Sequence, residues 1–310
     1  MSSYLGVDTS NYTTSFAVCG DIDCSVRKIL DVPEGARGIR QSDGVFMHMT
    51  NAPALFKQLC ENADVAKIKA VGVSTRPRSV EGSYMPVFLA GKTFAEIIGN
   101  TLNVPVYMFS HQDGHIMAGI ESAGRHDLLN NEFYAVHLSG GTCEILKTRY
   151  ENNQFNCEIC GGTLDISAGQ LIDRAGVAMG MKFPCGREIT ENALLCSEAP
   201  YHLSVSSKNG NINFSGSETQ VMKLTDGEYD RKKLSRAVLD CVGESLLKAL
   251  SAVGARNVLM VGGVSASAYL KEYLTENSKN TEFIFAAPEV STDNAWGIAK
   301  LVQRRSEYGT

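Results

Sequence analysis

The sequence lacks three features that would each define a class of protein. No window of the 310 residues approaches the roughly 18 uninterrupted apolar residues that a membrane-spanning helix needs. Met1 runs directly into the strand-like segment 4–8 without a basic or apolar leader, so no export signal is expected. The formal net charge is −5, so any contact with nucleic acid must be local or depend on a partner.

Cysteine is present but does not form a disulfide pattern. The nine cysteines are scattered among apolar segments, which favours buried free thiols in a reducing compartment. Cys157 and Cys160 are close in sequence, but no second pair stands at zinc-finger spacing, so we interpret them as two strand thiols. We therefore expect a cytoplasmic protein that does not enter a membrane.

The length and the order of segments indicate a duplicated α/β unit. Residues 4–19 and 133–148 each read as strand, polar turn and strand, and the later segments 68–74 and 257–264 read as buried strands. The order hairpin, helix, strand and loop thus occurs twice, which predicts two halves with a cleft between them.

The boundaries of these halves follow from the same pattern. We expect a first half over 1–118, a second half over 119–292, and a C-terminal helix over 293–305 that packs back on the first half. The stretch 204–227 is rich in Ser, Asn and Gly and is predicted to be a loop or small insertion. Helices are predicted over 52–61, 84–100, 164–179, 232–253, 267–277 and 293–305.

Two histidines four residues apart follow a predicted strand over 102–109. If a helix begins near Ser110, His111 and His115 share one face, which is the spacing of a metal-ligand pair. The zinc-peptidase motif needs a glutamate after its first histidine, and Gln112 stands there, so peptide hydrolysis is disfavoured. The alternative is an ordinary capped helix with a partly buried histidine.

Two polar hairpin turns indicate a nucleotide site. Short side chains let backbone N–H groups approach phosphate oxygens, although one such turn alone is usually structural. A third glycine-containing loop, after a strand and before a helix, is placed to hold a nucleoside. The catalytic candidates in the turns are Asp8, Ser139, Gly140 and Gly141, and the substrate-binding candidates are Thr9, Ser10, Thr142, Gly262 and Gly263.

Three aspartates outside the turns are further candidates. Asp165 and Asp173 are about two helical turns apart, so both carboxylates are predicted on one face, suited to ribose hydroxyls or an ammonium group. Alternatively, Asp165 stabilises the helix dipole and Asp173 pairs with a base such as Arg174. Asp293 reads as a helix-start residue, yet beside two imidazoles it would complete a three-ligand metal site with open positions.

Taken in order, these loops resemble the TsaD family, the tRNA threonylcarbamoyl transferases of the sugar kinase, heat-shock protein and actin (ASKHA) superfamily. The implied fold is α/β, with two duplicated ribonuclease H-like halves and a central cleft. The motifs that carry the resemblance lie at residues 5–10, 111–115, 139–141, 162–173, 183–186, 214–216, 262–266 and 292–294.

The resemblance implies transfer of a threonylcarbamoyl group from its adenylate to the amino group of a tRNA adenosine beside the anticodon, with release of AMP. One iron or zinc ion on His111, His115 and Asp293 would polarise the acyl group. TsaB-like and TsaE-like proteins are the implied partners, and a dimer is left open. The implied nucleotide-side positions are 139–142 over the acyl phosphate, Asp173 at the ribose, and Gly186 and Ser267 lining the pocket.

Several loops depart from the family pattern. The histidine of the Ser-Gly-Gly-His-Thr loop is replaced by Thr142, and Arg76 and Arg78 replace small residues of a glycine-rich stretch. Other departures are Asp165-Ile166 for Asp-Asp, Ser267 for Asn, and the sequence at 11–13 for an acidic turn. They favour a nucleotide-dependent carbamoyl-type transferase with another acceptor, and a non-catalytic nucleotide-binding subunit is a further alternative. The intact metal-ligand set argues against the second alternative.

Overall fold

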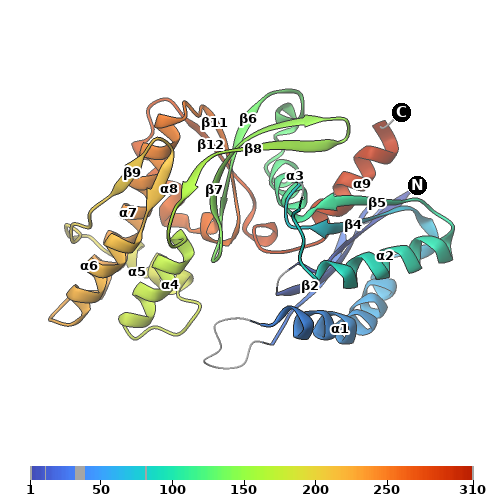
Figure 1. The fold of residues 1–310 in the computed structure, drawn as a ribbon, viewed down its shortest axis with the longest axis horizontal. Helices are drawn as coiled ribbons and strands as arrows, with labels where there is room; N and C mark the ends of the chain where they lie inside the picture. The colour runs from blue at the N-terminus through green and yellow to red at the C-terminus, as the bar shows by residue number, and fades with distance from the viewer. Residues whose placement is uncertain (1, 11, 32–38, 81, 309–310) are drawn as a thin grey trace. The chain divides into compact units, whose positions relative to one another are not determined.

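The computed structural model describes residues 2–10, 12–31, 39–80 and 82–308. The chain forms two compact units, each built around its own sheet (Figure 1). Unit 1 extends past the expected boundary at 118 because the helix after Ser110 and the turn that follows it stay with this unit. Unit 1 consists of Met1–Asn130, Tyr150–Asn156 and Thr292–Thr310, and unit 2 of Asn131–Arg149 and Cys157–Ser291.

Unit 1 contains a five-stranded sheet in the order β3-β2-β1-β4-β5. The hairpin predicted over 4–19 is confirmed, with Val7 opposite Phe16 in antiparallel register, while β1, β4 and β5 run parallel. The strands are β1 (Ser3–Asp8), β2 (Thr13–Gly20), β3 (Cys24–Ile29), β4 (Ile68–Arg76) and β5 (Val106–Ser110).

Helices cover both faces of this sheet, and alternate residues of β1 show it. Leu5 and Val7 pack with α1 and α2, whereas a Cβ on Gly6 would stand 2.2 Å from the backbone just before α9. Because successive side chains of a strand point to opposite faces, α1 and α2 lie on one face and α9 on the other. The helices of unit 1 are α1 (Gln41–Asn62), α2 (Phe88–Leu102), α3 (His111–Ala123) and α9 (Trp296–Tyr308), with 3-10 turns at Val65–Lys67 and His126–Asn130.

Two helix starts differ from the prediction. α1 begins at Gln41 rather than at 52 and continues through Pro53. α2 begins at Phe88 rather than at 84, because the residue before Pro86 is disfavoured in helical geometry.

Unit 2 repeats the strand order of unit 1. Its seven-stranded sheet runs β12-β11-β6-β7-β8-β10-β9, and within it β8-β7-β6-β11-β12 repeats the order β3-β2-β1-β4-β5, with β10 and β9 added beyond β8. The hairpin predicted over 133–148 is confirmed, and the duplication inferred from sequence is seen in the topology. The strands are β6 (Phe133–Leu138), β7 (Cys143–Glu151), β8 (Gln154–Thr163), β9 (Ser206–Lys208), β10 (Asn211–Asn213), β11 (Asn257–Val261) and β12 (Glu282–Phe285).

The stretch 204–227 is not an irregular insertion, so that prediction was wrong. It forms β9, β10 and α6, and it joins the sheet because β10 pairs with β8. Cys157 and Cys160 are free thiols of β8, as predicted. The helices of unit 2 are α4 (Ala168–Ala178), α5 (Gly186–Leu194), α6 (Ser215–Thr225), α7 (Arg231–Ala252) and α8 (Ala268–Asn277), with 3-10 turns at Gly263–Ala266 and Pro288–Val290. Among the described residues, no helix is both long and apolar enough to cross a membrane.

Candidate metal centre and nucleotide-binding elements

The first turn of α3 fixes the two histidines. Ser110 accepts a hydrogen bond from the backbone N–H of Asp113 at 3.1 Å, and the Asp113 carboxylate accepts one from Ser110 N–H at 2.9 Å. This reciprocal cap starts the helix at His111, as predicted. His111 and His115 therefore share one face, and their Nε2 atoms lie 3.0 Å apart.

Asp293 reaches this pair from the turn before α9. Its Oδ1 lies 3.5 Å from Nε2 of His111 and 3.4 Å from Nε2 of His115. The turn is anchored to the sheet, since Ser15 Oγ accepts a hydrogen bond from Ala295 N–H at 2.9 Å and Arg27 donates one to Thr292 at 2.7 Å. Because α9 begins only at Trp296, Asp293 is not the residue that caps it.

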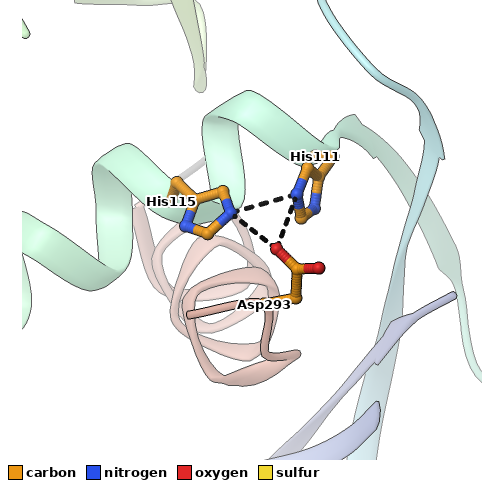
Figure 2. A group of neighbouring side chains, drawn as sticks. All are labelled: His111, His115 and Asp293. Atoms are coloured by element: carbon orange, nitrogen blue, oxygen red, sulfur yellow. Dashed lines mark hydrogen bonds and ion pairs between the residues drawn. The ribbon is translucent and has the colours of Figure 1, made fainter. Parts of the chain in front are cut away.

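The three ligand atoms face one another (Figure 2). Atoms bound about 2.0–2.2 Å from one zinc or iron ion are about 3–3.5 Å apart, and the separations here fall in that range. Two imidazoles and one carboxylate are also a donor set that iron and zinc accept. The residues present therefore fit the metal that the sequence motif predicts.

The charges of these groups depend on one another. Burial alone would lower the pKa of His111, but the carboxylates of Asp8 and Asp293 raise it to about 10. Burial alone would raise the pKa of Asp293, but hydrogen bonds and charge from the two histidines hold it well below its usual range. The two carboxylates thus favour the charged form of His111, and the two histidines favour the charged form of Asp293.

The side chains of the first predicted clamp have partners inside unit 1. Asp8, Thr9 and Ser10 are buried. Asp8 Oδ1 lies 3.3 Å from His111 Nδ1, and Thr9 Oγ1 bonds to the Val87 carbonyl and to Gly91 N–H at the start of α2. The structure does not place these side chains as exposed phosphate ligands. Asn11, in the departing turn at 11–13, lies outside the described residues.

The loop that carries Arg76 and Arg78 lies against the first turn of α3. Arg76 is the strand partner of Ser110, the residue before His111. The Pro77 carbonyl accepts a hydrogen bond from Gln112 N–H at 3.1 Å, and Ser79 donates one to the Asp113 carboxylate at 3.1 Å. The loop that departs from the family pattern is therefore bonded to the helix turn that carries His111.

In unit 2, the turn between β6 and β7 is closed by its own bonds. Ser139 N–H donates to the Thr142 carbonyl at 2.8 Å, and Thr142 N–H donates to Ser139 Oγ at 3.0 Å. Gly140 and Gly141 are exposed, and a Cβ on either would meet nothing within 4 Å. Ser167, the cap of α4, donates to the Gly140 carbonyl at 2.6 Å and fixes the turn against that helix.

The two aspartates predicted on one helix face are separated. α4 begins at Ala168 with Ser167 as its cap, so Asp165 precedes the helix as expected, but the prediction that it shares a helix face with Asp173 was wrong because residues 165–167 are not helical. The carboxylate of Asp165 accepts hydrogen bonds from the N–H groups of Phe214 and Ser215 at 2.8 and 3.0 Å, at the start of α6. Asp173 accepts one from Cys185 N–H at 2.8 Å, and burial raises its pKa.

The remaining nucleotide-side candidates lie at helix or turn starts of unit 2. Gly186 begins α5, directly after the residue bound by Asp173, and Gly263 begins the 3-10 turn after β11. Ser267 caps α8 and lies 2.8 Å from the Thr190 hydroxyl of α5. Gly262 has a φ of 96°, and a Cβ there would stand 2.5 Å from the Leu138 carbonyl, so this position requires glycine for packing.

Sequence reasoning missed the residues that support the metal centre. Ser74 donates to Asp8, Ser15 anchors the turn at Asp293, and Arg27 bonds to Thr292. The available signal for Ser74 was its place at the end of the predicted strand over 68–74. No local pattern identifies Ser15 or Arg27.

Comparison with known structures defines the class of fold. The chain aligns with component A of the (R)-2-hydroxyglutaryl-CoA dehydratase of Acidaminococcus fermentans at a TM-score of 0.60 and 13% identity, covering 99% of both chains. It aligns with a ROK family glucokinase from Streptomyces griseus at a TM-score of 0.52 and 11% identity, covering 97% of this chain and 99% of that one. The duplicated topology and these likenesses define an ASKHA fold.

The family follows from sequence. The sequence model described as TsaD, tRNA N6-adenosine threonylcarbamoyltransferase, matches residues 40–300. A protein of that name from Thermosipho melanesiensis is 29% identical over 95% of this chain and 92% of its own length. The chain belongs to the TsaD family.

Proposed function

We propose that this chain transfers a threonylcarbamoyl group from an acyl-adenylate to the N6 amine of a tRNA adenosine beside the anticodon. Family membership supports threonylcarbamoyl transfer to tRNA in general. The observation that carries the proposal for this chain is the convergence of His111, His115 and Asp293 within 3.0–3.5 Å. A departure in any of the three would have removed the centre.

The donor set is proposed to hold one iron or zinc ion. Such an ion, when bound, supplies Lewis-acid polarisation of a carbonyl oxygen. His111 and His115 present their Nε2 atoms from one helix face, and Asp293 supplies the negative charge that a divalent cation favours. Three protein ligands are typical of catalytic sites, whereas structural zinc sites use four.

Unit 2 supplies the proposed adenine-nucleotide elements, for ATP, AMP or the acyl-adenylate. Among the described residues, no protein group accepts a hydrogen bond from the N–H of Gly140 or Gly141, so both are available to phosphate oxygens. Asp173 is the proposed ribose ligand. It is linked to α5 because it bonds to Cys185, the residue before Gly186, and Ser267 is linked to the same helix through Thr190.

The proposal includes partners and a location. The net charge of −5 gives no general attraction to RNA, so local contact and TsaB-like and TsaE-like proteins are proposed to bring tRNA to the chain. A homodimer is compatible with the proposal. The reaction is proposed to take place in the cytoplasm. Peptidase activity is not proposed, because Gln112 cannot act as the general base that hydrolysis needs.

A second candidate is a carbamoyl-type transferase that uses a nucleotide but another acceptor. It is favoured by Arg76 and Arg78, whose loop contacts the first turn of α3, and by Thr142 in the glycine turn. Two guanidinium groups there would favour a more anionic substrate than a glycine-rich loop would.

Purified protein tests the proposal when combined with TsaB-like and TsaE-like proteins, threonylcarbamoyl-adenylate and unmodified tRNA. We expect AMP release, a threonylcarbamoylated adenosine and about one bound metal per chain. His111→Ala should lose both metal and transfer. His126→Ala is the matched control, because this exposed histidine pairs with Glu121 away from the centre. Transfer by His111→Ala at the wild-type rate would contradict the proposal.

A further inference from the structure

A buried carboxylate lies directly behind the candidate metal centre. Asp8, at the end of β1, has no exposed surface, and its Oδ1 lies 3.3 Å from Nδ1 of His111. The two nitrogens of the His111 ring therefore have different surroundings. Nδ1 faces Asp8, whereas Nε2 faces His115 and Asp293.

Asp8 is itself held by neighbouring strands. Ser10 donates a hydrogen bond to Oδ2 at 2.5 Å, and Ser74 of β4 donates one to Oδ1. β1 and β4 run parallel in the middle of the sheet, with Val7 beside Val73, so Ser74 is next to Asp8 by register. The carboxylate is thus anchored to the most buried part of unit 1 rather than to a loop.

We propose that Asp8 is a positioning residue: it accepts a hydrogen bond from the Nδ1–H of His111, which keeps the proton on Nδ1 and directs the Nε2 lone pair toward the metal. This inference rests on the metal centre of the proposed function. A carboxylate that receives the second ring N–H of a ligating histidine fixes the tautomer and the ring orientation and makes the nitrogen a stronger ligand.

The same geometry argues against the phosphate-clamp role that the sequence position of Asp8 suggests. It faces Nδ1, so it is on the far side of the ring from the atom that joins the ligand set. Both of its oxygens accept hydrogen bonds from serine hydroxyls, and its side chain is closed to solvent. The role proposed here for Asp8 is therefore to position His111, in place of the phosphate-clamp role expected from sequence.

Zinc affinity measured by competition with a chromophoric chelator tests this role. Asp8→Asn keeps the size and one acceptor oxygen but removes the charge, and we expect about 10- to 100-fold weaker binding. Ser10→Ala is the matched control, because it removes a buried hydrogen bond to the same carboxylate but leaves the charge beside His111. We expect a smaller loss of zinc affinity in Ser10→Ala than in Asp8→Asn, and equal affinity of Asp8→Asn and wild type would overturn the proposal.

A second measurement uses only the wild-type protein, so it does not depend on whether a variant folds. In the zinc-loaded, 15N-labelled wild-type protein, His111 should bind through Nε2 and show a slowly exchanging Nδ1 proton. Coordination through Nδ1, or a rapidly exchanging proton, would overturn the role of Asp8. A wild-type protein that binds no zinc or iron would instead contradict the metal centre of the proposed function, so the two failures are distinguishable.

Discussion

The backbones of Gly114 in α3 and Gly297 in α9 are in direct contact: a Cβ on Gly297 would stand 1.9 Å from the Gly114 carbonyl oxygen. Gly114 precedes His115 in α3, and Gly297 lies in the first turn of α9, four residues after Asp293. The separation of the ligands on the two elements therefore depends on a helix crossing that only glycine permits.

Gly297→Ala should push α9 away from α3 and from the metal centre. We expect a loss of about 1–3 kcal/mol in the free energy of unfolding, as for other overpacked sites, and weaker zinc binding. Gly216→Ala in α6 is the control, because its Cβ would meet nothing within 4 Å. Urea denaturation and chelator competition measure both quantities. Equal behaviour of the two variants would show that the helix crossing does not limit the site.

Asp165 is predicted to stabilise α6 rather than to bind substrate. Burial raises its pKa, but hydrogen bonds from Ser215 and Phe214 outweigh burial and hold the pKa below its usual value. Asp165→Ala should cost about 0.5–2 kcal/mol at pH 7. A lowered pKa in the fold means that the contribution of the ionised carboxylate is present above the usual value and is lost as the pH falls through the folded value.

The difference in stability between wild type and Asp165→Asn should therefore shrink as the pH falls below about 4, the usual pKa of an aspartate. Urea denaturation at several pH values between neutral and acidic measures it. A difference that is independent of pH would show that the carboxylate charge does not stabilise the start of α6.

Asp173 is predicted to lower the stability of the ligand-free protein and to strengthen the binding of adenine nucleotides. Because burial raises its pKa, the carboxyl group favours the fold below its usual pKa, and that contribution is lost as the pH rises through the folded value. Asp173→Asn should therefore raise the melting temperature of the ligand-free protein at neutral pH and weaken adenine-nucleotide binding by about 1–3 kcal/mol. Calorimetry with AMP, and with the exposed-site control Asp127→Asn, measures this. Unchanged affinity in Asp173→Asn would remove Asp173 from the nucleotide site.

Arg76 and Arg78 are predicted to act on the anionic substrate and not on the metal. Replacing both with Gln should weaken binding of threonylcarbamoyl-adenylate about tenfold or more, since each charged hydrogen bond contributes roughly 1.5–3 kcal/mol. Zinc content should not change. Arg149→Gln, an exposed arginine paired with Glu132, serves as the control. If substrate affinity is unchanged and stability stays within about 0.5 kcal/mol, the two arginines are solvated surface charges.

The features of the site that depend only on neighbouring residues could be predicted from the sequence. The cap at Ser110 and the four-residue spacing of His111 and His115 are contained in one helical turn, so the sequence was sufficient for them. Asp293 was ambiguous between a helix cap and a ligand, because the deciding contacts of its turn come from Ser15 and Arg27, far away in the chain.

Other features depend on register or on distant partners. Asp8 was assigned to a phosphate clamp on its local pattern alone. Its contact with His111 could not be predicted, because it joins residues 103 positions apart. The helix α6 was missed because the carboxylate at its start is that of Asp165, 50 positions earlier. The first half of α1 was missed and the helix continues through Pro53, where packing of Leu55 and Leu59 in the core compensates for one lost hydrogen bond.

The most direct test of the proposed function is rescue of a strain that lacks its own threonylcarbamoyl transferase. The chain would be expressed with TsaB-like and TsaE-like proteins, and the nucleosides of digested tRNA would be analysed by mass spectrometry. We predict that wild type and His126→Ala restore N6-threonylcarbamoyladenosine, whereas His111→Ala and Asp293→Ala do not. Unmodified tRNA in cells that contain the folded, metal-loaded wild-type protein would contradict the assignment of threonylcarbamoyl transfer to this chain.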